Sequence, residues 1–226
     1  MPTLAHDQPT AGSTRGSFLR SRLGSILAIA PLGVWTVIHL WNNLAVFTDG
    51  RAWEVAVTEH ASPVSLVVTS VIVLLPLVIH TGWGLTRLFA SKPNNARYRT
   101  FGNLRYALQR LSAIGVLAFL GAHLWLAFLS PRLIEHQPEP FTDIAGHMRH
   151  HLPTLVIYLL GTLGVAYHLA NGLSGFAMGW GVVSSQAGLR KVDRVAVVVF
   201  VVLLAMSWGV IYGLWDAGLP FRPRVD

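Results

Sequence analysis

The chain has 226 residues, of which 53% are apolar and only 12% are charged. Soluble domains carry about 25% charged residues, so this composition indicates a membrane protein, excludes a disordered chain and makes a nucleic-acid partner unexpected despite the net charge of +7. The chain contains no cysteine, which excludes disulfides, thiolate metal sites, thiol nucleophiles and the covalent attachment of a c-type haem.

Five stretches are long and apolar enough to cross a membrane as helices. Each reaches the roughly 20 residues that a helix needs to cross the hydrocarbon core. They cover about 21–47, 63–89, 106–130, 152–182 and 194–215. Backbone groups inside lipid must be hydrogen-bonded within the protein, so helices are expected. We therefore predict an all-α integral membrane protein with five transmembrane helices, with a tail over 1–20, a transmembrane domain over 21–218 and a second tail over 219–226.

Basic residues are divided unevenly between the two ends of these spans. One side would hold 12 of the 17 Lys and Arg residues, in the N-terminal tail and in the loops after the second and fourth spans. The other side would hold the remaining five, with eight of the ten acids. Because loops rich in Lys and Arg stay in the cytoplasm, we expect a cytoplasmic N-terminus and an outer C-terminus.

Four of the ten histidines lie inside spans, one in each of the first four: His39, His80, His123 and His168. An ionisable side chain inside a membrane indicates a function, because burying it is costly. At a rise of about 1.5 Å per residue, His39 and His123 lie toward the outer ends of their helices. His80 and His168 lie deeper, toward the inner side. A neutral histidine bonded to a neighbouring helix would explain one such residue, but it explains four poorly.

Two imidazoles at one depth on different helices can hold a flat metal macrocycle between them, and haem iron accepts axial histidines in such bundles. The first four helices would then surround two haem b groups. The outer one would be held by His39 and His123, and the inner one by His80 and His168.

The face of the fourth span around His168 is lined with glycine. The glycines at 161, 164, 172, 175 and 179 share that face with the histidine. A haem lying against bare backbone would explain the histidine in the middle of the stripe, with Gly164 and Gly172 as the nearest contacts. Tight helix packing is the alternative. Arg87 and Arg110, near the inner interface, are candidate contacts for haem propionates or quinone, and ordinary positive flanking explains them equally well.

Two further motifs suggest other chemistry. The string from Gly172 to Gly175 has the GxSG pattern of rhomboid intramembrane proteases, but its serine needs a later histidine as base and none follows His168. A short surface helix is expected within 131–151, where three histidines at i, i+3 and i+4 could bind a metal ion or meet haem propionates. These are His147, His150 and His151.

Strings around the histidines resemble a known family. They are Trp35-Thr-Val-Ile-His39-Leu-Trp, Leu108-Gln-Arg-Leu-Ser112, His123-Leu-Trp125 and Tyr167-His168-Leu-Ala-Asn-Gly172-Leu. With one histidine in each of four spans, the chain from about 20 to 190 resembles the cytochrome b membrane subunit of succinate dehydrogenase and quinol:fumarate reductase, in its single-chain, five-helix, two-haem form.

The resemblance implies the same two ligand pairs that the depths indicate. It also implies a bacterial inner-membrane location, with a flavoprotein carrying FAD and an iron–sulfur protein docked on the cytoplasmic face. Electrons from succinate would pass through the two haems to menaquinone or ubiquinone. The chain would be the subunit of the enzyme that does not bind succinate. The alternatives are a cytochrome b of another membrane dehydrogenase, such as a hydrogenase or nitrate reductase, and a haem-free anchor or transporter.

The family can use a glutamate at an outer quinone site. Glu54 and Glu59 are both candidates here, near an outer cluster of tryptophan and asparagine. The members of that cluster are Trp41, Asn42, Asn43 and Trp125. Some coupled fumarate reductases carry a membrane glutamate two residues before a histidine ligand; the matching position is Ala166, so that proton path is not expected.

Overall fold

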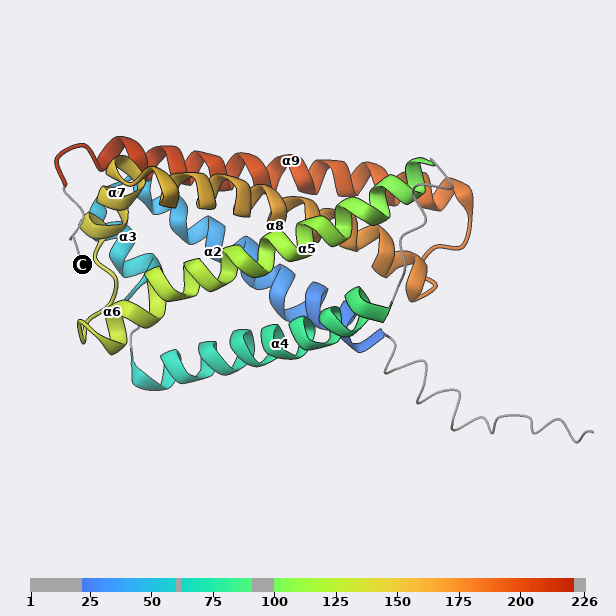
Figure 1. Cartoon of the computed structure of the whole chain (residues 1–226), viewed down its shortest axis with the longest axis horizontal. Coiled ribbons are helices and arrows are strands. Elements are labelled where there is room, and N and C mark those ends of the chain that lie inside the picture. Colours follow the sequence, from blue (N-terminus) through green and yellow to red (C-terminus); the bar gives the residue numbers. More distant parts are fainter. Residues whose placement is uncertain (1–21, 60–61, 91–99, 222–226) are drawn as a thin grey trace, which may run out of the picture.

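The computed structural model describes residues 22–59, 62–90 and 100–221, and these residues fold into a bundle of helices (Figure 1). The bounded elements are η1 (Ala28–Gly33), α2 (Val34–Asn43), η2 (Leu44–Phe47), α3 (Gly50–Val57), α4 (Pro63–Ala90), α5 (Phe101–Leu124), η3 (Trp125–Leu129), α6 (Ser130–Leu133), α7 (Phe141–His150), α8 (Leu152–Gly179) and α9 (Gln186–Ala217). The predicted all-α fold is confirmed. The tails over 1–20 and 219–226 lie outside the described residues, apart from 219–221.

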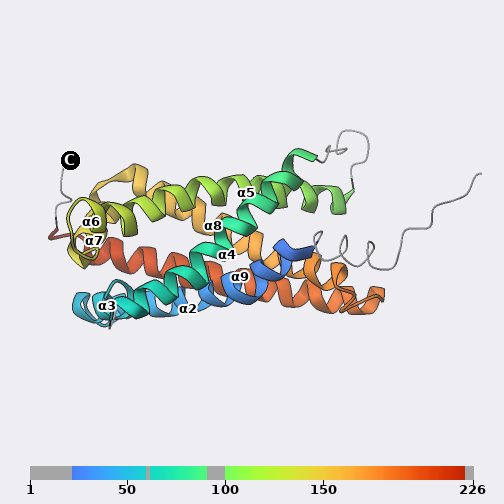
Figure 2. The ribbon, with the colours of Figure 1, turned by 90° about the horizontal axis from the view of Figure 1, so that it is seen from below.

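Five helical stretches of the described chain are long and apolar enough to cross a membrane, which confirms the predicted number of spans. They are Arg22–Phe47, Leu66–Ala90, Phe101–Leu133, Leu152–Gly179 and Gln186–Ala217. The stretches run side by side along the bundle, with α8 next to α9 and α4 along one flank (Figures 1 and 2).

The first span changes its helix type along its length. It passes through a π-helical segment, η1, before the regular α2, and it ends in the 3₁₀ turn η2. Pro31 lies inside η1. A proline has no N–H to donate and its ring crowds the preceding turn, which explains the wider turn at this point.

Two helix boundaries differ from the prediction because side-chain caps set them. Helix α5 begins at Phe101 rather than 106, where the Thr100 hydroxyl accepts a hydrogen bond from Asn103 N at 3.3 Å. Helix α9 begins at Gln186 rather than 194, where Ser185 Oγ accepts from Gly188 N at 3.1 Å. The basic residues at 190, 191 and 194 therefore lie in the first turns of α9, and their assignment to a loop was wrong. An apolar run marks the part that crosses lipid, whereas caps mark where the helix ends.

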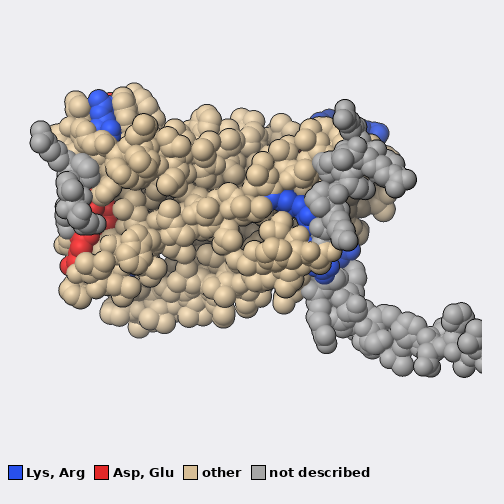
Figure 3. Space-filling model, viewed as in Figure 1, with Lys and Arg blue, Asp and Glu red and all other residues tan. Residues whose placement is uncertain are grey.

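The buried core lies at the end of the bundle that carries α3 and α7. A short helix is present within 131–151 as α7, but its predicted surface position was wrong: most of its residues are buried, and Ala145 and Met148 have no exposed surface. Helices α8 and α9 each contribute several buried residues. The end of the bundle opposite α3 and α7 carries most of the Lys and Arg visible in Figure 3, while Asp and Glu gather at the α3 end.

Helix α4 is packed differently from α8 and α9. None of the residues in its most apolar segment is buried, and its main contact with another helical segment is with η1. The space-filling surface is hollowed between α4 and α5 (Figure 3). The side of α4 that faces α5 and α8 therefore has few protein partners.

Candidate functional site

The structure brings together the two members of each predicted histidine pair. The imidazole centres of His39 on α2 and His123 on α5 are 5.9 Å apart. Those of His80 on α4 and His168 on α8 are 6.3 Å apart. His39 and His123 lie in the last turns of α2 and α5, the ends that lead into α3 and α6, whereas His80 lies in the C-terminal half of α4 and His168 in that of α8.

Both separations fit one metal ion between two imidazoles. A bond from a metal ion to an imidazole nitrogen is about 2 Å long, so two rings on opposite sides of one ion have centres roughly 6 Å apart. The second pair also lies where α4 has few protein partners, which leaves room for a macrocycle around the metal. The spacing of both pairs therefore fits a haem with two axial histidines, and the sparse packing of α4 gives the second pair space for it.

Hydrogen bonds orient three of the four rings through the Nδ1 atom. His80 Nδ1 lies 2.8 Å from the carbonyl oxygen of Gly24, and His123 Nδ1 lies 3.0 Å from the Tyr158 hydroxyl. His168 Nδ1 lies 3.3 Å from both Ser112 Oγ and the Gln109 carbonyl oxygen. A ring that donates its Nδ1–H in this way leaves Nε2 as the metal ligand.

The ring of His39 has different neighbours. Its Nε2 lies 3.4 Å from Asn43 Nδ2, and the same amide donates to the His39 carbonyl at 2.8 Å. The buried Asn43 also accepts a hydrogen bond from Trp53 Nε1 at 3.1 Å, which ties α3 to the turn below His39. Of the predicted outer cluster, Asn43 therefore reaches a candidate ligand, whereas Trp41 and Trp125 are exposed on the surface of the bundle.

Three glycines of the stripe on α8 face α5, whereas Gly179 lies against the Arg22 guanidinium of the first span. A Cβ at Gly164 would lie 3.5 Å from Val116 Cγ2, and one at Gly172 would lie 3.9 Å from Gln109 Nε2. Gly161 is in the closest contact, against the ring of Phe119, whereas a Cβ at Gly175 would meet no atom within 4 Å. Close packing of α8 against α5 thus explains why a glycine is needed at position 161.

The two candidate arginines lie at the end of α4. Arg110 Nη2 donates to the carbonyl oxygens of Arg87 at 2.9 Å and Leu88 at 3.1 Å. Its guanidinium lies 4.7 Å from the ring centre of Tyr106, and that of Arg87 lies 5.4 Å from the ring centre of Trp83. Arg110 therefore links the C-terminal turn of α4 to α5, at the end of the bundle that is nearer to the His80–His168 pair.

Both candidate carboxylates share a partner in Arg51. Arg51 binds Glu59, and it lies 3.5 Å from Glu54. The hydrogen bond and the charge of Glu59 raise the pKa of Arg51 above its usual value. Glu54 Oε1 also accepts from the backbone N of Phe141 at 3.0 Å, at the first turn of α7. Glu54 thus has a structural contact in addition to any role in proton exchange.

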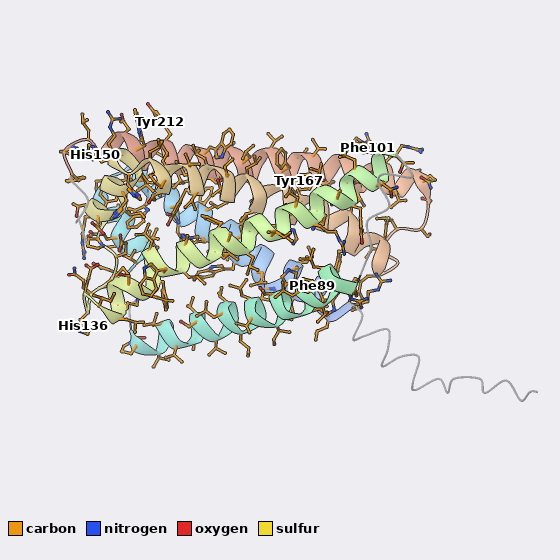
Figure 4. All side chains as sticks on the ribbon, viewed as in Figure 1. Phe89, Phe101, His136, His150, Tyr167 and Tyr212 are labelled. Atoms are coloured by element: carbon orange, nitrogen blue, oxygen red, sulfur yellow. The ribbon has the colours of Figure 1, made fainter. Side chains whose placement is uncertain are left out.

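The GxSG motif receives no geometric support, and of the three loop histidines only His147 and His151 have a ring contact within the described residues, with centres 6.1 Å apart. Ser174 Oγ of the GxSG pattern donates to Asp193 at 2.9 Å, so its hydroxyl is bound to a carboxylate rather than to a histidine. Helix α7 ends at His150, which is exposed at that end of the bundle (Figure 4), and His151 continues in extended conformation. Across 22–59, 62–90 and 100–221, no group of three His, Cys, Asp or Glu side chains could hold a metal ion.

Several residues that contact the histidines were not predicted. Gln109 and Ser112 belong to the string that carries the family resemblance, but nothing in the string shows that they contact His168. Tyr158 lies ten residues before His168, and its hydroxyl inside an apolar span was the available signal. The partner of His80 is the backbone carbonyl of Gly24, and residue types in the sequence do not indicate a contact of this kind.

A bundle of membrane-spanning helices in which four spans bring their histidines together in two pairs is the arrangement expected of a cytochrome b membrane subunit. The chain belongs to the succinate dehydrogenase/fumarate reductase transmembrane subunit family, whose model matches residues 90–207. It is 28% identical to the succinate dehydrogenase cytochrome b558 subunit of Bacillus subtilis (strain 168) over 187 residues, which are 82% of this chain and 91% of that protein. The family predicted from the sequence is thus confirmed.

Proposed function

We propose that this chain is the di-haem membrane subunit of a succinate:quinone oxidoreductase. It anchors a flavoprotein and an iron–sulfur protein to the membrane and passes their electrons through two haem b groups to quinone. The observation that carries the proposal is the pair of histidine contacts, each spaced for one iron atom. Family membership and the likeness to a succinate dehydrogenase cytochrome subunit support it.

Four side chains would hold the two haems. His80 and His168 bind the inner haem, and His39 and His123 bind the outer one. Bound haem supplies reversible one-electron transfer at iron. The Nδ1 contacts of His80, His123 and His168 would hold their Nε2 atoms toward the metal, while Gly164 and Gly172, one turn either side of His168, add no side chain beside it. Arg87 and Arg110 place positive charge where the propionates of the inner haem would lie.

The distribution of charge supports a cytoplasmic N-terminus. Among the residues that the structure describes, the bundle end opposite α3 carries most of the Lys and Arg side chains. In this orientation the inner haem faces the docked iron–sulfur subunit, and the outer haem lies near the opposite surface. The two haems then form a path across the membrane.

The first expected result is a haem content of two per chain. Purified complex should contain two b-type haems for each membrane subunit, both low-spin, because each iron has two imidazole ligands. A pyridine haemochrome assay against protein mass measures the number. One haem per chain, or none, would contradict the pairing.

An outer quinone site would give the outer haem its task. Glu54 and Glu59 lie at the α3 end, and α3 is tied to His39 through Trp53 and Asn43. A carboxylate at this end can exchange the protons that quinone chemistry needs. We therefore place the quinone near the outer haem, with Glu54 or Glu59 as its proton partner.

The variants Glu54→Gln and Glu59→Gln test this placement. A glutamine at 54 can still accept the hydrogen bond from Phe141, so the change removes the exchangeable proton and keeps the contact. We expect succinate:quinone activity to fall about 100-fold in one of the two variants, with unchanged activity toward an artificial acceptor. Glu135→Gln, at the same end of the bundle, is the control. Full quinone activity in both variants, with a quinone or inhibitor bound near Arg110 and Ser112, would move the site to the inner face.

A further inference from the structure

A chain of hydrogen bonds connects His168 to α9, which alone among the five membrane-spanning stretches of the described chain has no histidine. Arg105 begins it: Nη1 lies 3.0 Å from Asp193 Oδ1 on α9, and Nε donates to Asn171 Oδ1 at 2.9 Å. Asn171 Nδ2 donates to Gln109 Oε1 at 2.8 Å. Gln109 Nε2 donates to the His168 carbonyl at 3.1 Å and lies 3.2 Å from His168 Nδ1.

The guanidinium fixes the direction of every bond in this chain. Arginine has donors and no acceptor, so Asn171 must turn its oxygen to Arg105 and its amino group to Gln109. Gln109 must then turn its oxygen to Asn171 and its amino group to His168. One charged side chain thus decides how two carboxamides are oriented.

This orientation limits the hydrogen bond that His168 can make. When Nε2 binds iron, Nδ1 carries a proton, and an amide nitrogen cannot accept it. The proton is left to the Gln109 carbonyl and Ser112 Oγ, both at the long distance of 3.3 Å. If the Gln109 carboxamide were reversed, its oxygen would replace the nitrogen that lies 3.2 Å from Nδ1. A stronger acceptor there makes the imidazole more basic, which favours ferric iron and lowers the potential.

We propose that Arg105, acting through Asn171 and Gln109, keeps the midpoint potential of the inner haem high by holding the Gln109 amino group toward His168. Arg105, Asn171 and Gln109 are positioning residues, and Asp193 holds the guanidinium from α9. Ser174 Oγ donates to the same Asp193 oxygen at 2.9 Å, which fixes that carboxylate between α8 and α9. The inference rests on the proposed role of His168 as a haem ligand.

The variant Arg105→Lys tests the inference in the assembled complex. Lysine keeps the charge but lacks the planar fork that holds Asn171 and Asp193 together, so the Gln109 carboxamide is free to reverse. A redox titration of the two haem α bands should show a lower potential for the inner haem and an unchanged one for the outer haem. Arg190→Lys, an exposed residue on α9, should shift neither haem. An unchanged inner potential, or equal shifts of both haems, would overturn the inference.

A double variant tests whether Arg105 acts through the Gln109 carboxamide. In the Gln109→Leu background there is no carboxamide to orient, so adding Arg105→Lys should cause no further shift. An equal shift with and without Gln109 would show that Arg105 does not act through the Gln109 carboxamide, and the inference would be wrong.

The variant Asn171→Asp tests the same inference if the complex with Arg105→Lys does not assemble. An aspartate offers only acceptors, so Gln109 would turn its amino group to it and its oxygen to His168. The inner potential should fall, and this fall should shrink in the Gln109→Leu background. No difference between the two backgrounds overturns the inference.

The haem content of the unmodified complex tells the two failures apart. If it shows fewer than two haems per chain, the proposed function fails. If two haems are present and the inner potential does not respond to these variants, only the orienting chain is wrong.

Discussion

Replacing His80 with alanine is expected to remove or convert the same haem as replacing His168, and to leave the other haem intact. The two ring centres are 6.3 Å apart, so under the proposed function both rings would bind one iron. His39→Ala and His123→Ala should likewise share the other haem. Losing an axial ligand leaves iron five-coordinate or bound to a substitute. Since even outer contacts of a metal ligand are worth about 10–100-fold, we expect succinate:quinone activity to fall by more than about 100-fold.

Reduced-minus-oxidised spectra and a redox titration of each variant measure this result. His136→Ala and His150→Ala are the controls, because both side chains are exposed at the α3 end of the bundle (Figure 4). If variants of His80 and His123 changed the same haem, the assignment of pairs by depth would be wrong.

Gly161→Ala is expected to destabilise the bundle, whereas Gly175→Ala on the same helix is not. A methyl group at 161 would run into the ring of Phe119, which is itself buried. Overpacking of this kind costs about 1–3 kcal/mol of unfolding free energy. At Gly175 there is no atom within 4 Å of the added carbon. Alanine is the better helix former by about 1 kcal/mol, so that variant should be neutral or stabilising in a helix interior.

Displacement of the Phe119 ring by Gly161→Ala should also disturb the outer histidine pair. The Phe119 ring stacks on His123 with centres 5.5 Å apart and meets Tyr158 at 5.3 Å. Thermal unfolding in detergent, followed through the haem bands, compares the two variants. Gly161→Ala should lower the melting temperature and disturb the outer haem first. Equal melting temperatures for both variants would show that the α5–α8 contact can rearrange freely.

Much of the fold could be predicted because lipid imposes simple rules. The length of an apolar run gives the number of spans, and a fixed rise per residue gives the depth of each histidine. That depth paired His39 with His123 and His80 with His168, as the structure does. Helix ends were predicted less well, since Thr100 and Ser185 set them through single hydrogen bonds in polar segments.

The surroundings of the rings could not be predicted from the same rules. Gln109 and Asn171 are 62 positions apart in the chain, and their contact depends on the rotation of two neighbouring helices and on side-chain rotamers. Arg105 and Arg110 both counted as flanking charge. Yet one orients amides beside His168, and the other binds the last carbonyls of α4. Residue type and depth do not distinguish these roles.

The sparse packing of α4 has a consequence for the supply of this subunit in the cell. Little apolar burial against other helices holds α4 in place, and it carries His80, one of the two proposed ligands of the inner haem. Docking of α4 and insertion of the inner haem are therefore expected to be one step, with α4 joining last. A chain made without haem would keep one helix loosely attached and open to membrane proteases. The abundance of the subunit would then follow the rate of haem synthesis.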